Sequence, residues 1–181
     1  MTGARPGATV SCVTTGVDGT RALAGALAAL CRPGDIVLLS GDLGAGKTAF
    51  AQGFGAALGV GETITSPTFA LVRQYPTDRG PIRTLLHADV YRLDHLQEIV
   101  DLGLGELVED GGVAVVEWGD RAEPVLGSGS LAVHIVASPA EPDSPEADDD
   151  RRSITLAPIG PAWDSRWERL TAALAPWVEA P

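Results

Sequence analysis

The sequence predicts an α/β protein with a mostly parallel central sheet, helices on both faces and antiparallel strands at its edges. Residues 35–40 and 113–118 form short apolar runs, a pattern typical of parallel strands that are buried on both faces. Residues 49–58 place phenylalanine and leucine on one helical face, and Gly59 is a stop signal for that helix. With 181 residues, the chain is long enough for one such domain with a substantial core.

A phosphate-binding loop is predicted between the first apolar run and this helix. Its residues 41–48, GDLGAGKT, fit the pattern G-x-x-x-x-G-K-[ST]. In such loops backbone N–H groups surround the phosphates, the lysine reaches the β- and γ-phosphate oxygens, and the Ser or Thr hydroxyl binds Mg²⁺. The expected nucleotide contacts in this segment are therefore Asp42, Leu43, Gly44, Ala45, Gly46, Lys47 and Thr48.

Lys47 is the only lysine of the chain, whose other Lys/Arg residues are all arginine. An arginine fork is too broad and planar to fit between two phosphates as an ammonium does. A functional loop is therefore favoured over a chance glycine-rich turn. The preceding strand and following helix are the context that the motif requires, and a helix N-terminus attracts anions. These features predict a three-layer P-loop NTPase fold.

The remaining elements are predicted from local patterns. A first strand is expected at 9–15, followed by a helix that Asp18 caps and that ends near Cys31. Two extended runs, 69–75 and 82–90, are joined by a hairpin-like turn. A helix is expected to start near Asp94, with an inner face of Leu96, Ile99, Val100 and Leu104. A last strand pair is expected at 131–136 and 153–156.

The domain organisation predicted is a P-loop ATPase domain at 1–160 and an amphipathic helical tail at 161–181. Within the domain, the proline- and acid-rich segment 138–151 is expected to form a mobile loop, because it has little apolar surface to bury. The tail places apolar residues on one helical face, which we expect to pack on its own domain; a partner surface is the alternative. The residues of that face are Trp163, Trp167, Leu170, Leu174 and Trp177.

The charge and composition of the chain limit the functions and locations that are expected for it. A net charge of -11 argues against direct nucleic-acid binding, which relies on clustered Lys and Arg, so any contact with RNA should need a partner. The sequence contains neither a membrane-length apolar run nor a secretion signal, and a cytoplasmic protein is expected. Cys12 and Cys31 lack metal-type spacing and are expected to be reduced and buried.

An acid at the end of a neighbouring strand should complete the phosphate site, because open parallel sheets bind ligands at that edge. Glu117 ends the run 113–116 and is the better candidate; Asp89 ends a run that His87 interrupts. Both acids are candidates for holding Mg²⁺ or orienting a nucleophile. His87 is expected to be a core histidine, with a supporting role at the site as the alternative. The hydroxyls of segment 66–68 could sense a γ-phosphate or only stabilise a turn.

Four motifs in one order closely resemble the TsaE (YjeE) family: GDLGAGKT at 41–48, SPTF at 66–69, HADVYRL at 87–93 and VEW at 116–118. The resemblance extends over about residues 9–136. It implies a small bacterial ATPase needed for the threonylcarbamoyladenosine modification of tRNAs that read codons starting with A. In that family the ATPase works with TsaD and TsaB, and hydrolysis is thought to reset their tRNA-modifying complex between turnovers.

The same resemblance implies roles for individual residues. Thr48 and Glu117 match Mg²⁺ positions, and Asp89 matches a site acid. Trp118 matches an aromatic residue beside the nucleotide, and Thr20 a position near the adenine. The tail and the segment 138–150 have no counterpart that the resemblance explains.

The sequence is also compatible with other functions. A small-molecule or nucleoside kinase shares the loop but usually closes an arginine-rich lid, and the arginines here are scattered. A third possible function is that of a nucleotide-gated binding module that does not hydrolyse the nucleotide. Arg92 is the internal candidate for an arginine finger; otherwise a partner would supply one and activity alone would be weak. ATP is expected rather than GTP, because the guanine-reading Asn-Lys-x-Asp needs a second lysine.

Overall fold

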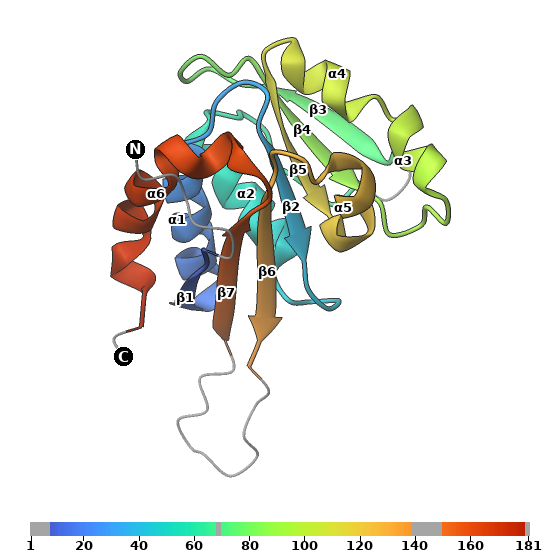
Figure 1. Ribbon diagram of the computed structural model, residues 1–181. Helices are drawn as coiled ribbons and strands as arrows, with labels where there is room; N and C mark the ends of the chain where they lie inside the picture. Colours follow the sequence, from blue (N-terminus) through green and yellow to red (C-terminus); the bar gives the residue numbers. More distant parts are fainter. Residues whose placement is uncertain (1–7, 68–69, 139–149, 180–181) are drawn as a thin grey trace.

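The computed structural model describes residues 8–67, 70–138 and 150–179. In this part of the chain the strands form one seven-stranded sheet in the order β1-β7-β6-β2-β5-β4-β3 (Figure 1). The strands are β1 Val10–Thr15, β2 Ile36–Ser40, β3 Val72–Pro76, β4 Thr84–Asp89, β5 Gly112–Glu117, β6 Leu131–Ala137 and β7 Arg151–Pro158.

The centre of the sheet is parallel and its edges are antiparallel. β2 runs parallel to β5 on one side and to β6 on the other, and β5 is also parallel to β4. β3 pairs antiparallel with β4, forming the predicted hairpin, whereas β7 pairs antiparallel with both β6 and β1. The predicted mostly parallel sheet with antiparallel edges is therefore confirmed.

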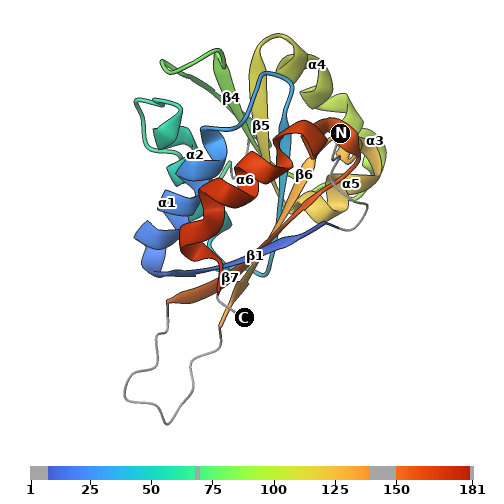
Figure 2. The same ribbon diagram turned by 60° about the vertical axis from the view of Figure 1, so that its left-hand side comes forward.

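Helices cover both faces of the sheet (Figures 1 and 2). On one face lie α1 Gly16–Ala28 and α2 Lys47–Ala57, and on the other lie α3 Leu96–Asp101, α4 Leu104–Glu109 and α5 Gly119–Leu126. Successive side chains of β2 point to opposite faces of the sheet, so the strand contributes to a hydrophobic core on each face. Val37 and Leu39 pack with the helices of the first face, and Leu38 packs with those of the second. A Cβ on Gly53 would lie 2.3 Å from the carbonyl oxygen of Arg21, so glycine is needed where α1 and α2 touch.

The first helix begins earlier than predicted. It was expected to start after Asp18, but it begins at Gly16, directly after β1, and ends at Ala28. Gly16 takes a positive φ of 69° and its N–H donates to the carbonyl of Asp150 at 2.9 Å, so the chain turns at once from strand to helix. Asp18 lies in the first turn of α1 and is not the N-cap residue. Its carboxylate there interacts favourably with the positive end of the helix dipole.

The predicted inner face near residue 100 is partly wrong. Ile99 and Leu104 are buried as expected. Leu96 and Val100, expected on the same face, are instead 46% and 49% exposed. Gly103 has a φ of 65° and separates α3 from α4, so one helical period does not continue across these residues. The helix α5 was not predicted, and Pro124 lies inside it.

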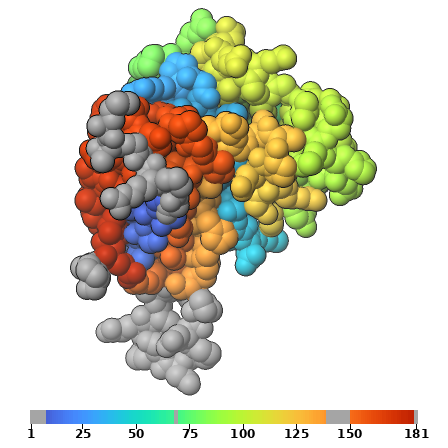
Figure 3. All heavy atoms as spheres, viewed as in Figure 1, coloured from blue at the N-terminus to red at the C-terminus, as the bar shows by residue number. Residues whose placement is uncertain are grey.

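The C-terminal segment packs on the domain. It forms a 3-10 helix at Pro161–Arg166, α6 at Trp167–Leu174 and a second 3-10 turn at Ala175–Trp177, rather than one helix. Trp163, Leu170 and Leu174 are completely buried in the core on the α1 side. Figure 3 shows this segment, in red, as the outer surface beside the first strand. The expected packing of the apolar stripe on its own domain is confirmed, although Trp167 and Trp177 are only partly buried.

A buried ion pair anchors this segment. The guanidinium of Arg166 lies 2.6 and 2.8 Å from the two carboxylate oxygens of Asp35, which precedes β2. Its charge also stands 3.9 Å from the ring centroid of Trp163. Because Arg166 and Asp35 are 3% and 7% exposed, each charge depends on the other for compensation.

Two further expectations concern the acidic segment and membrane-spanning helices. The acidic segment predicted as a mobile loop lies, for residues 139–149, outside the described residues. In the part of the chain that the structure does describe, none of the helices combines the length and the apolar character needed to cross a membrane.

We predict that Arg166→Met destabilises the protein by about 3–5 kcal/mol, because it leaves the Asp35 carboxylate buried without its counter-charge. Urea denaturation measures the change. Arg169→Met, on the exposed side of α6, is the matched control and should stay within about 0.5 kcal/mol of the unaltered protein. Equal effects of the two substitutions would contradict the anchoring role of the pair.

Candidate functional site

The glycine-rich loop connects β2 to α2 at the carboxyl edge of the parallel strands. Gly41 and Gly46 have φ values of 141° and 113°, which only glycine adopts readily. A Cβ on Gly41 would also lie 2.2 Å from the carbonyl oxygen of Ile135 in β6. The two glycines that the motif fixes are thus needed for the path of the backbone, and α2 begins directly behind the loop at Lys47.

The Lys47 ammonium is held inside the loop. Its Nζ donates to the carbonyls of Gly41 and Asp42, each at 2.8 Å, and stands 4.1 Å from the ring centroid of Trp118. Burial lowers the pKa of Lys47, while the carboxylates of Glu117 and Asp89 act in the opposite direction. The ammonium therefore donates to two loop carbonyls, and the oxygens of a bound anion could take their place as acceptors.

Thr48 of the loop and Glu117 at the end of β5 are in contact. The Thr48 hydroxyl donates to Oε1 of Glu117 at 3.0 Å. The contact follows from the sheet: β2 and β5 are parallel neighbours in which Leu39 is paired with Glu117, and α2 starts just beyond β2. Glu117 is only 3% exposed, so its carboxylate needs donors from the protein.

His87 supplies the second donor to this carboxylate. Its Nε2 lies 2.9 Å from the same Oε1 of Glu117. The histidine was expected to be a core residue, and it is indeed fully buried, but it also supports the site. Because a carboxylate accepts, the hydrogen bond assigns the proton to Nε2. Its Nδ1 is buried and has no hydrogen-bond partner among the described residues.

Asp89 lies beside Glu117 because the parallel pairing of β4 with β5 places the two strand ends opposite each other. Its carboxylate accepts from the Ser66 hydroxyl at 3.1 Å and from the Tyr91 backbone N–H at 2.9 Å. The hydroxyl predicted at Ser66 therefore reaches the site, whereas Thr68 lies outside the described residues.

The oxygen donors of Thr48, Glu117 and Asp89 suit Mg²⁺, a hard cation. Among the described residues, no three His, Cys, Asp or Glu side chains gather closely enough to hold a metal by themselves. Mg²⁺ in phosphoryl-transfer sites usually has one or two carboxylates and takes its other ligands from phosphates and water. The residues present therefore fit a metal that arrives with a nucleotide.

Trp118 forms one wall of the site. It has a φ of 59°, a conformation that non-glycine residues adopt at a cost of about 1–3 kcal/mol, which is common at functional sites. Its ring centroid is 4.7 Å from that of Tyr91. The two rings line a pocket of about 190 Å³ with Asp89 and Arg92, and Leu43 of the loop lies at its edge with 91% of its surface exposed.

Thr20 lies apart from these groups. It is 2% exposed, and its hydroxyl lies 3.0 Å from that of Thr14 in a hydrogen bond that links α1 to β1. The expected position near the adenine stays a prediction.

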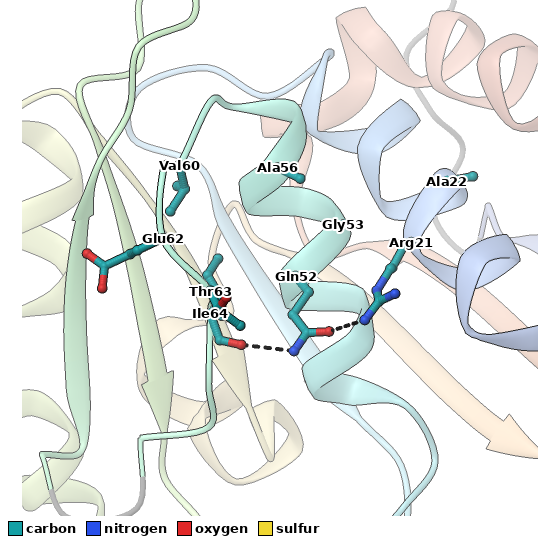
Figure 4. A pocket seen from close by; sticks show the side chains of 9 residues that line it. All are labelled: Arg21, Ala22, Gln52, Gly53, Ala56, Val60, Glu62, Thr63 and Ile64. Atoms are coloured by element: carbon teal, nitrogen blue, oxygen red, sulfur yellow. Dashed lines mark hydrogen bonds between the residues drawn. The ribbon is translucent and has the colours of Figure 1, made fainter.

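A second hollow lies between α1, α2 and residues 60–64, and its volume is about 510 Å³. Figure 4 shows Gln52 at its centre, accepting from Arg21 at 2.8 Å and donating to the carbonyl of Ile64 at 2.9 Å. None of its lining residues belongs to the phosphate loop or to the acids beside it. The hollow is therefore not the site that the motifs predicted.

One residue that contacts the loop could not be predicted from the sequence. Arg152, in strand β7, donates from Nε to the carbonyl of Ala45 at 3.1 Å. It is separated from the loop by more than a hundred residues and belongs to no motif. Only the tertiary pairing of β7 with β6 brings it to the site.

We predict that His87→Leu lowers the free energy of unfolding at pH 7 by about 1–3 kcal/mol, because Glu117 loses a donor in a buried place. His87→Gln places an amide nitrogen near the position of Nε2 and should cost less. Urea denaturation of both variants checks this. If the glutamine and leucine variants were equally destabilised, the hydrogen bond to Glu117 would not be the reason for the histidine.

Comparison with known proteins identifies the family. A family model described as threonylcarbamoyl adenosine biosynthesis protein TsaE matches residues 14–144. A relative from Bacillus subtilis, named tRNA threonylcarbamoyladenosine biosynthesis protein TsaE, is 37% identical over 158 residues, covering 87% of this chain and 91% of the relative. A relative with that name from Streptomyces coelicolor is 40% identical over 145 residues, covering 79% and 93%.

A solved structure agrees with these sequence relatives. The crystal structure of Bacillus subtilis YdiB matches with a TM-score of 0.67 and 34% identity, covering 93% of this chain and 95% of that one. The resemblance inferred from the four motifs is thereby confirmed. The chain belongs to the TsaE family of tRNA threonylcarbamoyladenosine biosynthesis proteins.

Proposed function

We propose that this protein is a Mg²⁺-dependent ATPase that acts on a complex of TsaD and TsaB and resets it between rounds of tRNA modification. The observation that carries the ATPase proposal is the hydrogen bond from Thr48 of the phosphate loop to Glu117 at the end of β5. It brings together a loop suited to phosphates and a carboxylate suited to a divalent cation. The partners rest on family membership, and a cytoplasmic location accords with that role.

The residues of the site divide the work of hydrolysis. Backbone N–H groups of residues 42–48 would hold the phosphates, and Lys47 would exchange its bonds to loop carbonyls for bonds to phosphate oxygens. Thr48, Glu117 and Asp89 would hold Mg²⁺, which when bound neutralises the charge developing on the phosphates. Glu117 and Asp89 would also orient the attacking water, and Trp118 would lie beside the nucleotide.

Activity without partners should be weak. Phosphoryl transfer is accelerated strongly by an arginine that stabilises the charge of the transition state. Arg92 lines the pocket beside Asp89 and is the internal candidate for that role. A partner could instead supply or position such a group, which would couple hydrolysis to the assembled complex. The net charge of -11 supports contact with tRNA only through that complex.

ATP turnover measured with and without the TsaD–TsaB pair and tRNA tests the proposal. We expect slow release of phosphate from the protein alone and a clear increase with the pair. The proposal fails if the pair neither binds the protein nor raises turnover. Transfer of phosphate to a small molecule in a metabolite panel would favour a kinase, and ATP binding without phosphate release would favour a binding module.

Two substitutions separate binding from turnover. Lys47→Ala should weaken ATP binding about 10- to 100-fold, because it removes a charged hydrogen bond to the phosphates. Glu117→Gln should bind ATP with little change but lose about 100-fold in Mg²⁺-dependent turnover. Calorimetric titration gives the first quantity and phosphate release the second. Normal hydrolysis by Glu117→Gln would refute the role given to this carboxylate.

A further inference from the structure

We infer that Arg152 is a positioning residue that turns the Ala45–Gly46 peptide so that the Gly46 N–H faces the bound phosphates. The inference rests on the proposed nucleotide binding and adds a residue that lies outside the four motifs. Arg152 acts through the loop backbone, and no contact between its side chain and the nucleotide is required.

The side chain of Arg152 lies against the loop. Its Nε donates to the carbonyl of Ala45 at 3.1 Å, and a Cβ placed on Gly46 would be 3.9 Å from the same nitrogen. Arg152 pairs with Ala137 of β6 and Thr14 of β1, so its backbone is held from both sides in the sheet. Only 16% of its side chain is exposed, so most of it is buried against the protein beside the loop.

The remainder of the guanidinium is also held. One terminal nitrogen lies 3.6 Å from a carboxylate oxygen of Asp150, and the other donates to the carbonyl of Arg151 at 3.4 Å. The backbone carbonyl of Asp150 in turn accepts from Gly16 at the start of α1. These contacts fix the direction in which Nε points.

The bond to Ala45 determines where the next N–H points. In a trans peptide the C=O and the following N–H point in opposite directions. A carbonyl of Ala45 that is directed at Arg152 therefore directs the Gly46 N–H away from β7. In a loop that binds phosphate through backbone N–H groups, this donor serves the anion.

The loop itself leaves this orientation weakly determined. Gly46 has a φ of 113°, and glycine reaches many other conformations at little cost. The Ala45 N–H is bonded to the carbonyl of Asp42 at 3.1 Å, and the Gly46 carbonyl accepts from Phe50 at 2.9 Å. The peptide between them gains a third contact from Arg152, on a different strand.

Two substitutions test the bond separately from the charge. Arg152→Met keeps much of the length of the side chain but removes the donor. Arg152→Gln also removes the charge, but its amide nitrogen is as many bonds from the backbone as Nε is and can donate to Ala45. Arg151→Met is the matched control, since neighbouring side chains of a strand point to opposite faces and Arg151 pairs with Glu179 instead.

The measurements are calorimetric titration with Mg²⁺–ADP and Mg²⁺–ATP, melting of each nucleotide-free variant, and the amide NMR signal of Gly46. Arg152→Met should bind both nucleotides about ten-fold more weakly. The loss should be equal for both, because the loop holds the phosphates that they share. Arg152→Gln and Arg151→Met should stay within about three-fold of the unaltered protein. The Gly46 amide signal should shift on ADP binding in all but Arg152→Met.

Several results would overturn the inference. Equal losses in Arg152→Gln and Arg152→Met would mean that the charge matters rather than the bond to Ala45. A loss for ATP alone would indicate direct contact with the γ-phosphate. Melting of Arg152→Met well below that of Arg151→Met would make the role structural. Failure of the unaltered protein to bind either nucleotide would instead refute the proposed function, and this inference with it.

Discussion

The arrangement of the site depends on the parallel pairing of β5 with its two neighbours. That pairing sets Glu117 beside Leu39 of β2 and beside Asp89 of β4, so that three strand ends meet at one edge. A shift of one residue would turn the Glu117 side chain to the other face of the sheet. The hydrogen bonds that Glu117 accepts from Thr48 and His87 both require this register. The order of strands thus assembles side chains that are far apart in sequence.

The sequence predicted those parts of the site that arise from local pattern. The glycine-rich loop, the strand before it and the helix behind it are adjacent in the chain, and an acid at a strand end marks the edge where ligands bind. The role of His87 could not be read in this way, because an apolar strand accommodates a core histidine equally well. Arg152 was missed because only the antiparallel return of β7 beside β6 brings it to the loop. The common inner face expected for residues 96–104 was mispredicted because α3 ends at Asp101 and Gly103 separates it from α4, which carries Leu104.

The C-terminal segment shows the same division between local and tertiary information. Its apolar spacing predicted a stripe that packs on the domain, and Trp163 and Leu170 are indeed buried. The ion pair between Arg166 and Asp35 had no signal, because its members are far apart in the chain and each would be an ordinary surface residue in isolation. Such a buried pair contributes less to net stability than its contacts suggest, but removal of one member leaves a costly charge. It holds the segment in one position at the end of the sheet opposite the strand ends that carry the acids.

The electrostatics of the loop give a reason for a metal requirement in the proposed reaction. The Lys47 ammonium is the one lysine charge of an acidic chain, and the carboxylates of Glu117, Asp89, Asp42 and Asp120 all act on it. A nucleotide with several negative charges would meet more carboxylates than cations near the loop and would be repelled without further compensation. A divalent cation, which Glu117 would help to hold, would supply that compensation. In the proposed reaction Glu117 would therefore make hydrolysis, rather than binding, depend on the metal-bound form of the nucleotide.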